Sequence, residues 1–270
     1  MNIISLKLVT FSPTGTTRKI IEGIAQGINH SATEHIDITR QENRTRQLET
    51  SNNELLIIGV PVYFGRVQTH ALDWLQTIKA CQTPTVCVVV YGNREYDDAL
   101  LELKDSVHQR GCLPIACAAF IGEHSFSNAE APLAVGRPDA DDLRLARSFG
   151  ERIREKIAAT SSSSLIAEIT VPGNYPYVDM TESRERLSSL DFIEIDTSCV
   201  QCGECARLCP VGAIDPENGA AIDKDKCILC HACLKNCPSK ARKIRHDLIR
   251  STALWLSETF QVRKEPVTFL

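Results

Sequence analysis

Eight of the twelve cysteines fall into two copies of one spacing pattern between residues 199 and 237. Each copy reads Cys-x-x-Cys-x-x-Cys-x-x-x-Cys-Pro, and every matched pair of positions lies 28 residues apart. Three cysteines at steps of three let one tight loop offer three thiolates to the irons of a cubic cluster, and the proline turns the fourth cysteine elsewhere. The pattern therefore predicts two iron–sulfur clusters held by a duplicated segment.

The fourth cysteine of each copy is expected to bind the cluster of the other copy, as in the two-cluster arrangement. We assign cluster one to Cys199, Cys202, Cys205 and Cys237, and cluster two to Cys227, Cys230, Cys233 and Cys209. This exchange would make the clusters the core of a segment with few large apolar side chains. Zinc is the alternative, although it favours paired Cys-x-x-Cys knuckles. His231, inside the second loop, is expected to be exposed or, alternatively, to tune the cluster potential by its protonation.

Residues 1–160 alternate strand-like and helix-like segments, as in an α/β fold. Strands are expected at 5–10, 34–38, 55–60, 85–91 and 114–120, and helices at 16–28, 69–80, 96–110 and 139–158. Several of the strands are continuous apolar runs, which is typical of parallel strands buried on both faces. The pattern predicts a doubly wound, five-stranded parallel sheet. For 40–53 we expect only a short or irregular helix.

A loop rich in hydroxyl side chains joins the first strand to the first helix. Its candidate binding residues are Ser12, Thr14, Gly15, Thr16 and Thr17. Backbone N–H groups at a helix N-terminus and nearby hydroxyl groups form a natural phosphate cradle. The loop lacks the lysine of a P-loop and the three glycines of a dinucleotide loop. It therefore predicts a phosphate-bearing ligand at the carboxyl edge of the sheet.

Two further loops follow the third and fourth predicted strands and should reach the same edge. They contain Pro61, Val62, Tyr63, Phe64, Gly65 and Arg66, and Tyr91, Gly92, Asn93, Arg94 and Tyr96. Glycine permits close approach of the backbone and the aromatic rings could stack, so the set indicates a flat aromatic cofactor. Packing in the core or on the surface is the alternative for each aromatic ring taken singly.

Composition bounds the remaining organisation. The chain has 270 residues, a net charge of −4 and no apolar run long enough to span a membrane. We therefore expect a cytoplasmic protein of two domains that does not bind nucleic acid. The expected divisions are a first domain at 1–160, a linker or crossover at 161–190, the cysteine domain at 191–245, and a C-terminal helix and tail at 246–270. The serine run at 161–164 marks the first boundary, and Tyr175 and Tyr177 are expected to pack between the domains.

The N-terminal part resembles the flavodoxin superfamily, and the cysteine part resembles the bacterial two-cluster ferredoxins, whose clusters are both of the 4Fe–4S type. Nearly the whole chain is similar to the flavodoxin–ferredoxin fusion proteins known as ferrodoxins. The first resemblance implies FMN, with its phosphate held by residues 12–17 and its isoalloxazine ring framed by 63–66 and 92–96. Arg66 would then stabilise negative charge on the reduced flavin. His124 is expected in a surface turn or, alternatively, near the flavin.

Together these features predict an electron-transfer protein that passes single electrons between two 4Fe–4S clusters and FMN. The expected partner is another redox protein, either a ferredoxin or a reductase. The alternative is a flavin-dependent reductase of a small organic acceptor, fed by ferredoxin or NAD(P)H. Basic residues after the second cluster are expected to form a solvated face or a docking patch: Lys240, Arg242, Lys243, Arg245 and Arg250. The cysteines outside the two motifs, Cys81, Cys87, Cys112 and Cys117, are expected to be buried structural thiols.

Overall fold

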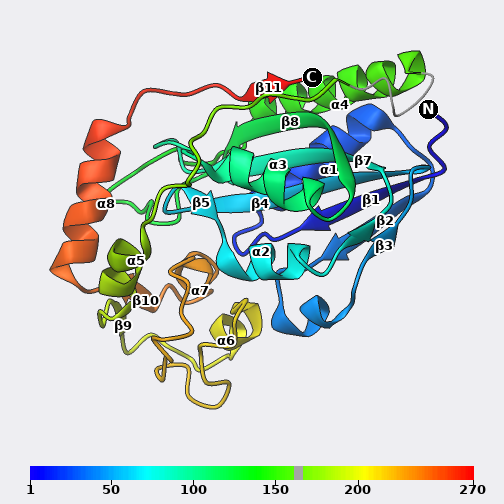
Figure 1. Ribbon diagram of the computed structural model, residues 1–270. Coiled ribbons are helices and arrows are strands. Elements are labelled where there is room, and N and C mark those ends of the chain that lie inside the picture. The colour runs from blue at the N-terminus through cyan, green and yellow to red at the C-terminus, as the bar shows by residue number, and fades with distance from the viewer. Residues whose placement is uncertain (161–166) are drawn as a thin grey trace.

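The computed structural model describes residues 1–160 and 167–270. The serine run at 161–164, which was expected to mark the first domain boundary, lies outside the described residues. A central sheet carries helices on both faces, and the segment at 191–245, here called the cysteine segment, lies beside it (Figure 1).

Five strands of the central sheet run parallel. They are β1 (Ser5–Thr10), β2 (Thr33–Asp37), β4 (Glu54–Tyr63), β7 (Thr83–Tyr91) and β8 (Cys112–Ile121). Their spatial order is β2-β1-β4-β7-β8, which is the flavodoxin-like order of a doubly wound sheet. The predicted fold class is therefore confirmed. All of β7 is buried, as its continuous apolar run indicated.

Four helices cover the two faces of this sheet. On one face α1 (Thr16–Ile28) packs beside α4 (Ala140–Ala159), and on the other lie α2 (Thr69–Leu75) and α3 (Ala99–His108). The start of α4 shows how local sequence sets an element. Asp139 accepts hydrogen bonds from the backbone N–H groups of Asp141 and Asp142, and the Asp142 side chain accepts one from the N–H of Asp139.

Two short stretches differ from the expected elements. The helix expected at 69–80 ends at Leu75, and Lys79–Ala80 instead forms β6, which pairs with β3 (Glu49–Thr50). The helix in the stretch at 40–53 is a short 3-10 helix, η1 (Gln41–Thr45), as predicted, and β3 follows it. A two-residue strand, β5 (Arg66–Val67), folds back on the end of β4.

The cysteine segment contains little regular structure. Its short helices α6 (Glu204–Leu208) and α7 (Ala232–Lys235) follow the two cysteine loops, and β9 (Ile193–Ile195) pairs antiparallel with β10 (Arg242–Ile244). A helix precedes it, α5 (Thr181–Ser188), within the stretch that was expected to be a linker.

The crossover at 171–178 packs on α3 rather than between the domains. The carboxylate of Asp98 accepts hydrogen bonds from the backbone N–H groups of Asn174 (2.8 Å) and Val178 (2.6 Å). The Tyr177 hydroxyl donates to Asp105 at 2.9 Å. Tyr175 is 81% exposed, so the expectation that this tyrosine packs between the domains was wrong.

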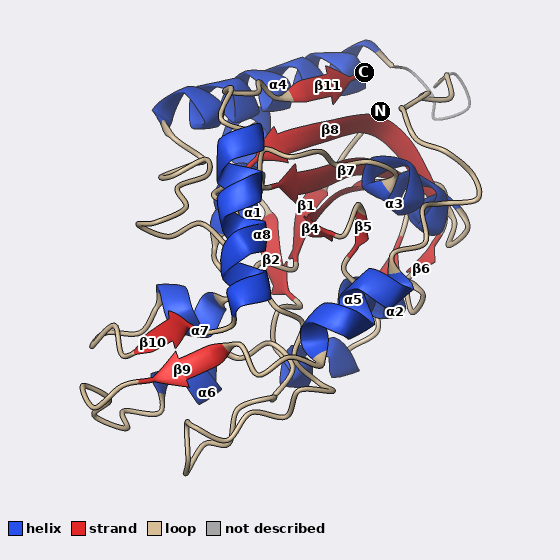
Figure 2. Cartoon of the chain, turned by 90° about the vertical axis from the view of Figure 1, so that its left-hand side faces the viewer, coloured by secondary structure: helices blue, strands red, loops and turns tan. Residues whose placement is uncertain are grey.

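The C-terminus returns to the first domain. Helix α8 (Asp247–Thr259) extends along one side of the molecule, from the cysteine segment toward the level of the sheet (Figure 2). After it the chain runs along the molecule to β11 (Val267–Phe269), which pairs antiparallel with β8 and extends the sheet by one edge strand (Figure 1). We expected a tail here, but not its pairing with β8.

Candidate functional site

Two small cavities in the cysteine segment are each lined by four cysteines. The first, here called the outer cavity, is lined by Cys199, Cys202, Cys205 and Cys237. The second, here called the inner cavity, is lined by Cys209, Cys227, Cys230 and Cys233. Each group of four is one of the two ligand sets assigned from the spacing, including the exchange of the fourth cysteine between copies.

The backbone repeats with the sequence. Gln201 and Leu229 occupy matched positions 28 residues apart, and both are left-handed, with φ of 50° and 57°. The next matched pair, Gly203 and His231, is left-handed too, at 73° and 56°. These conformations turn each loop around its cavity immediately before the short helix that carries the third cysteine. A non-glycine residue rarely adopts such a conformation, so its presence at His231 points to a constrained site.

The inner cavity is deeply buried and its lining is largely apolar. Val211, Ala213 and Ile214 from the first copy contribute to it. Burial raises the pKa of the Cys230 thiol well above its usual range and that of Cys233 to about 12. These thiols are therefore protonated at neutral pH until a metal displaces their protons, which is how metal binding couples to folding in such segments.

The outer cavity reaches the molecular surface. Cys202 is exposed, and Val200 in the same loop is 70% exposed. In the described residues no three His, Cys, Asp or Glu side chains lie close enough to hold one metal ion. Thiolates around a four-iron cube stand farther apart than those around a single ion, because each binds a different iron.

The four remaining cysteines differ in burial. Cys87, Cys112 and Cys117 are buried in the sheet, whereas Cys81 is exposed. The expectation of a buried structural thiol was therefore wrong for Cys81.

His231 joins the cysteine segment to the loop after β8. Its ring is stacked on Phe126 at a centroid distance of 4.7 Å and on Phe192 at 5.5 Å. Its Nδ1 lies 3.1 Å from the carbonyl oxygen of Ser125, and burial lowers its pKa to about 3. With only 3% of its surface exposed, His231 is not the exposed loop residue we expected. Its uncharged ring packs between Phe126, in the loop after β8, and Phe192, in the cysteine segment.

The loop after β4 contacts the inner cysteines. Phe64 packs against a buried apolar cluster that contains Leu229, with Cys227 at its margin. Burial, and then the neighbouring thiols of Cys230 and Cys227, raise the pKa of the Tyr63 hydroxyl. The inner cavity therefore lies next to the first domain, whereas the outer cavity opens to the molecular surface.

The loop at 12–17 keeps the features of an anion cradle. Gly15 has a left-handed φ of 84° and open space beside it, and α1 begins at the next residue. Thr16 and Thr17 are thus in the first turn, whose N–H groups have no partner within a helix. The Thr17 hydroxyl is buried and has no hydrogen-bond partner among the described residues. The Ser12 hydroxyl accepts from the N–H of Arg18 at 3.0 Å.

Several residues expected to frame a flavin ring are engaged elsewhere. Tyr91 and Tyr96 are buried in the core, with ring centroids 5.5 Å apart. The guanidinium of Arg66 donates twice to the carboxylate of Glu102 on α3 and lies over the ring of Tyr177. The two tyrosine rings thus pack in the core, which was the alternative to framing a flavin, and Arg66 is neutralised by Glu102.

The glycine at 92 allows His124 to approach. A β-carbon on Gly92 would collide with the ring of His124, which is half-buried in the loop after β8. The Nδ1 of His124 accepts a hydrogen bond from the N–H of Phe126 at 3.0 Å, and burial lowers the pKa of His124 to about 4.

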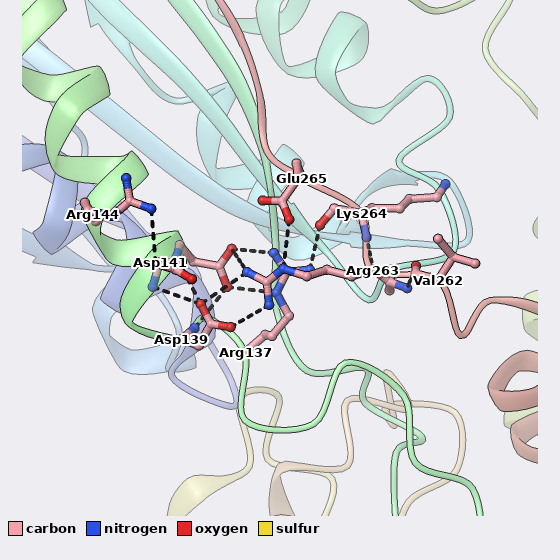
Figure 3. Close-up of polar contacts among 10 residues, drawn as sticks. Arg137, Asp139, Asp141, Arg144, Val262, Arg263, Lys264 and Glu265 are labelled. Atoms are coloured by element: carbon pink, nitrogen blue, oxygen red, sulfur yellow. Dashed lines mark hydrogen bonds and ion pairs between the residues drawn. The ribbon is translucent and has the colours of Figure 1, made fainter.

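The C-terminal tail is anchored at this end of the sheet by an ion-pair network (Figure 3). Arg263 pairs with Asp139 at 2.6 Å, and Arg137, itself paired with Asp142, donates to the carbonyl oxygen of Lys264 at 2.7 Å. The Lys264 ammonium donates to the carbonyl oxygen of Arg94 at 2.5 Å. The tail therefore packs against the loop at 92–96, through contacts of Lys264 with Asn93 and Arg94.

A larger cavity of about 570 Å³ lies between the two parts of the molecule. The first domain contributes Tyr63, Arg66 and His70, and α5 contributes Arg184. Cys227, an inner cysteine, lines the same cavity. Sequence reasoning missed this site because α5 carries no strong periodic signal.

Residues 192–242 match the family described as "4Fe-4S dicluster domain". This segment is a 4Fe–4S dicluster domain. The match confirms the iron–sulfur interpretation of the cysteine repeat, and it spans both cavities together with β9 and the first residue of β10. The chain thus combines a flavodoxin-like sheet with a dicluster domain.

The similar curated proteins match over short stretches of the chain. One of the subunits of an ion-translocating oxidoreductase complex from Methanosarcina acetivorans is 43% identical over 51 residues, which is 18% of this chain and 19% of that protein. Pyruvate synthase subunit PorD from Methanothermobacter marburgensis is 39% identical over 56 residues, 21% of this chain and 65% of that protein. The chain therefore spans less than two thirds of the length of either relative.

Among solved structures, a flavodoxin from the domain Archaea is similar, with 13% identity and a TM-score of 0.38. The similarity covers 57% of this chain and 99% of that one. As for membranes, the described residues contain no helix with the length and apolar character needed to cross one.

Proposed function

We propose that this protein is an electron carrier that passes single electrons between two 4Fe–4S clusters and FMN, on behalf of another redox protein. The four outer cysteines would hold cluster one, and the four inner cysteines would hold cluster two. The relatives are named as subunits of an ion-translocating oxidoreductase complex and of pyruvate synthase, which supports a role in electron transfer with a protein partner.

The position of the inner cavity is the observation that carries the proposal. The loop after β4 contributes Tyr63 and Phe64 next to Cys227, whereas Val200 and Cys202 of the outer cavity face solvent. An external partner would then exchange electrons at cluster one, and cluster two would serve the first domain. Joining the two parts in one chain gives the internal step a high effective concentration.

The residues of the loop at 12–17 fit the phosphate of FMN. The unpartnered hydroxyl of Thr17, the backbone N–H groups of Thr16 and Thr17 at the start of α1 and the open space at Gly15 suit an anion at this position. Tyr63, Phe64 and Gly92 remain candidates for the isoalloxazine ring. When bound, FMN would supply a group that takes one or two electrons, where each cluster passes one.

The direct test is anaerobic purification followed by iron and flavin analysis. We expect about eight iron atoms, from two four-iron cubes, and one FMN per chain. Titration with reduced ferredoxin, NADH and NADPH should bleach the flavin absorbance with at least one donor. A protein that contains zinc, or that retains no flavin when FMN is supplied, would contradict the proposal.

The cavity of about 570 Å³ favours a second candidate function, the reduction of a small organic acceptor. It is large enough for such a molecule, and both Tyr63 and Cys227 line it. Ser188 also lines this cavity, so Ser188→Trp should fill part of it, whereas Ser189→Trp alters the exposed neighbour. If an acceptor such as menadione is reduced in the cavity, only the first variant should lose menadione reduction. An electron carrier would keep its exchange with reduced ferredoxin in both variants.

A further inference from the structure

Arg242 is a buried cation without an anionic partner in the part of the chain that the structure describes. It is only 6% exposed. Its Nη1 donates to the carbonyl oxygen of Gly219 at 2.8 Å, but its Nε and Nη2 are buried and meet no acceptor among the described residues. A buried charge is costly unless it is paired and hydrogen-bonded. We had expected Arg242 to lie on a solvated basic face, which is wrong.

The outer cavity supplies the place for the missing partner. Arg242 lines this cavity together with its four cysteines. A β-carbon built on Gly219 would lie 3.2 Å from the Sγ of Cys205 and 3.7 Å from the Nη1 of Arg242, so the guanidinium is close to that thiol. Four thiolates and a cube carry net negative charge, and their sulfur atoms accept hydrogen bonds. The unused N–H groups of Arg242 fit such a partner.

Of the two cysteine cavities, Arg242 lines only the outer one, although its charge also acts on the thiols of Cys227 and Cys233 in the inner set. Pro210, Val211 and Ile214 line the inner cavity. The positions 28 residues later, Pro238, Ser239 and Arg242, line the outer cavity. Two apolar side chains of the first copy are thus replaced by polar ones in the second. The Ser239 hydroxyl lies 3.7 Å from the Sγ of Cys237, so it adds a further polar contact to the outer cysteines.

We infer that Arg242, supported by Ser239, raises the reduction potential of the outer cluster above that of the inner cluster. Each cluster takes up one electron and becomes more negative, so a nearby cation and hydrogen bonds to sulfur stabilise the reduced form. Solvent exposure at Cys202 acts in the same direction, whereas the apolar lining at Ile214 disfavours added charge. The first electron therefore rests on the exposed cluster, and transfer from the inner to the outer cluster is the downhill step.

The inference rests on the proposed ligand sets and not on the flavin. An anaerobic titration of the purified holoprotein with dithionite, followed by EPR spectroscopy, should show two clusters of unequal potential. Cys202→Ser changes a ligand of the outer cluster alone and so identifies its signal. We expect that signal to appear first. If the inner cluster is reduced first, the inference is overturned, whether or not any Arg242 variant folds.

Variants at Arg242 test the cause. Arg242→Ile copies the residue at the matched position of the first repeat, and Arg242→Lys keeps the charge. We expect Arg242→Ile to lower the equilibrium constant for reducing the outer cluster at least tenfold, which is 59 mV for one electron. The inner cluster should change less, and Arg242→Lys should retain most of the potential. Lys243→Gln is the matched control, because Lys243 follows Arg242 on β10. This variant removes an exposed charge that is paired with Asp196.

Equal potentials for the outer cluster in Arg242→Ile and the wild type, with full iron content, would contradict the role of Arg242. A protein that holds both clusters but no FMN would refute the proposed electron carrier and leave this titration valid.

Discussion

The side-chain amide of Asn93, in the loop after β7, donates a hydrogen bond of 2.7 Å to the carbonyl oxygen of Phe260, at the end of α8. The same amide donates to the carbonyl oxygen of Val262 at 2.9 Å, and its oxygen accepts from the N–H of Lys264. One buried side chain of the flavodoxin-like domain thus fixes the chain that leaves the dicluster domain. The flavodoxin-like domain therefore contacts the C-terminal half of the chain at two separate places. One is the tail held by Asn93, and the other is the packing of Phe64 beside the inner cavity.

We predict that Asn93→Asp loosens the tail. Aspartate also tolerates the left-handed φ of 66° at this position, but it cannot donate to the two carbonyl groups. The free energy of unfolding should fall by about 2 kcal/mol. Hydrogen exchange at residues 262–269 should accelerate in the holoprotein, whereas Asn43→Asp, in the exposed part of η1, should change neither quantity. Unaltered exchange in the tail would show that Asn93 does not hold it.

Replacing Thr17 by valine should weaken FMN binding without weakening the fold. The hydroxyl has no partner among the described residues, so its loss costs the flavin-free protein no hydrogen bond. A lost hydrogen bond to a phosphate should lower the affinity for FMN at least about tenfold. Riboflavin, which lacks the phosphate, should bind wild type and variant equally in a fluorescence titration. Equal FMN affinities would remove Thr17 from the site. Thr252→Val, on α8, is the control.

Cys205→Ala should remove cluster one and leave FMN bound. The inner set of cysteines is intact in this variant, so iron should fall from about eight to about four atoms per chain. Cys81→Ala, at an exposed cysteine outside both cavities, should retain all the iron. Metal analysis and the flavin absorbance measure both results. Iron near eight atoms in Cys205→Ala would show that the ligand assignment is wrong.

His124 should make the protein acid-sensitive between about pH 6.5 and pH 4. Burial lowers its pKa to about 4 in the folded protein, against about 6.5 in an unfolded chain. As the pH falls below 6.5, His124 binds a proton in the unfolded chain but stays neutral in the folded protein. The free energy of unfolding therefore declines until about pH 4. The loss from this group between pH 7 and pH 5 should be about 2 kcal/mol.

The variant His124→Asn tests this prediction, because asparagine can still accept the hydrogen bond from Phe126. It should be less stable at every pH, since the ring is lost, but its stability should fall less steeply from pH 7 to pH 5. Unfolding midpoints of the holoprotein measure that slope. His108→Asn, at an exposed histidine on α3, should keep the slope of the wild type. The prediction fails if His124→Asn keeps it too.

Much of the fold follows from local patterns. The predicted bounds of β1 and α1 agree with the structure, because an apolar run ends at a turn-forming loop and a periodic helix begins there. α2 is shorter than predicted because its last residues pair with β3, a strand too short to show a pattern. Local periodicity carries no information about such a partner.

The aromatic residues at the ends of the strands show the same limit at the candidate site. Tyr91 and Tyr96 stand in loops where a flavin ring was expected, yet both rings turn into the core. A tyrosine at a strand end suits either place, and the packing of neighbouring helices decides between them. Arg66 likewise carries a positive charge that could stabilise a reduced flavin, but its guanidinium is paired with the carboxylate of Glu102 on α3.

The sequence by itself determined the chemistry of the dicluster domain, because thiolate spacing sets which cysteines can share one cube. It also determined the five parallel strands and the loop between β1 and α1, since these rest on local periodicity and turn residues. Only the tertiary structure decided that the tail pairs with β8, that His231 is wedged between Phe126 and Phe192, and that Arg242 is buried beside the outer cysteines. Burial and pairing between distant segments depend on packing in three dimensions. The sequence alone does not show whether a charged residue such as Arg242 is buried or exposed.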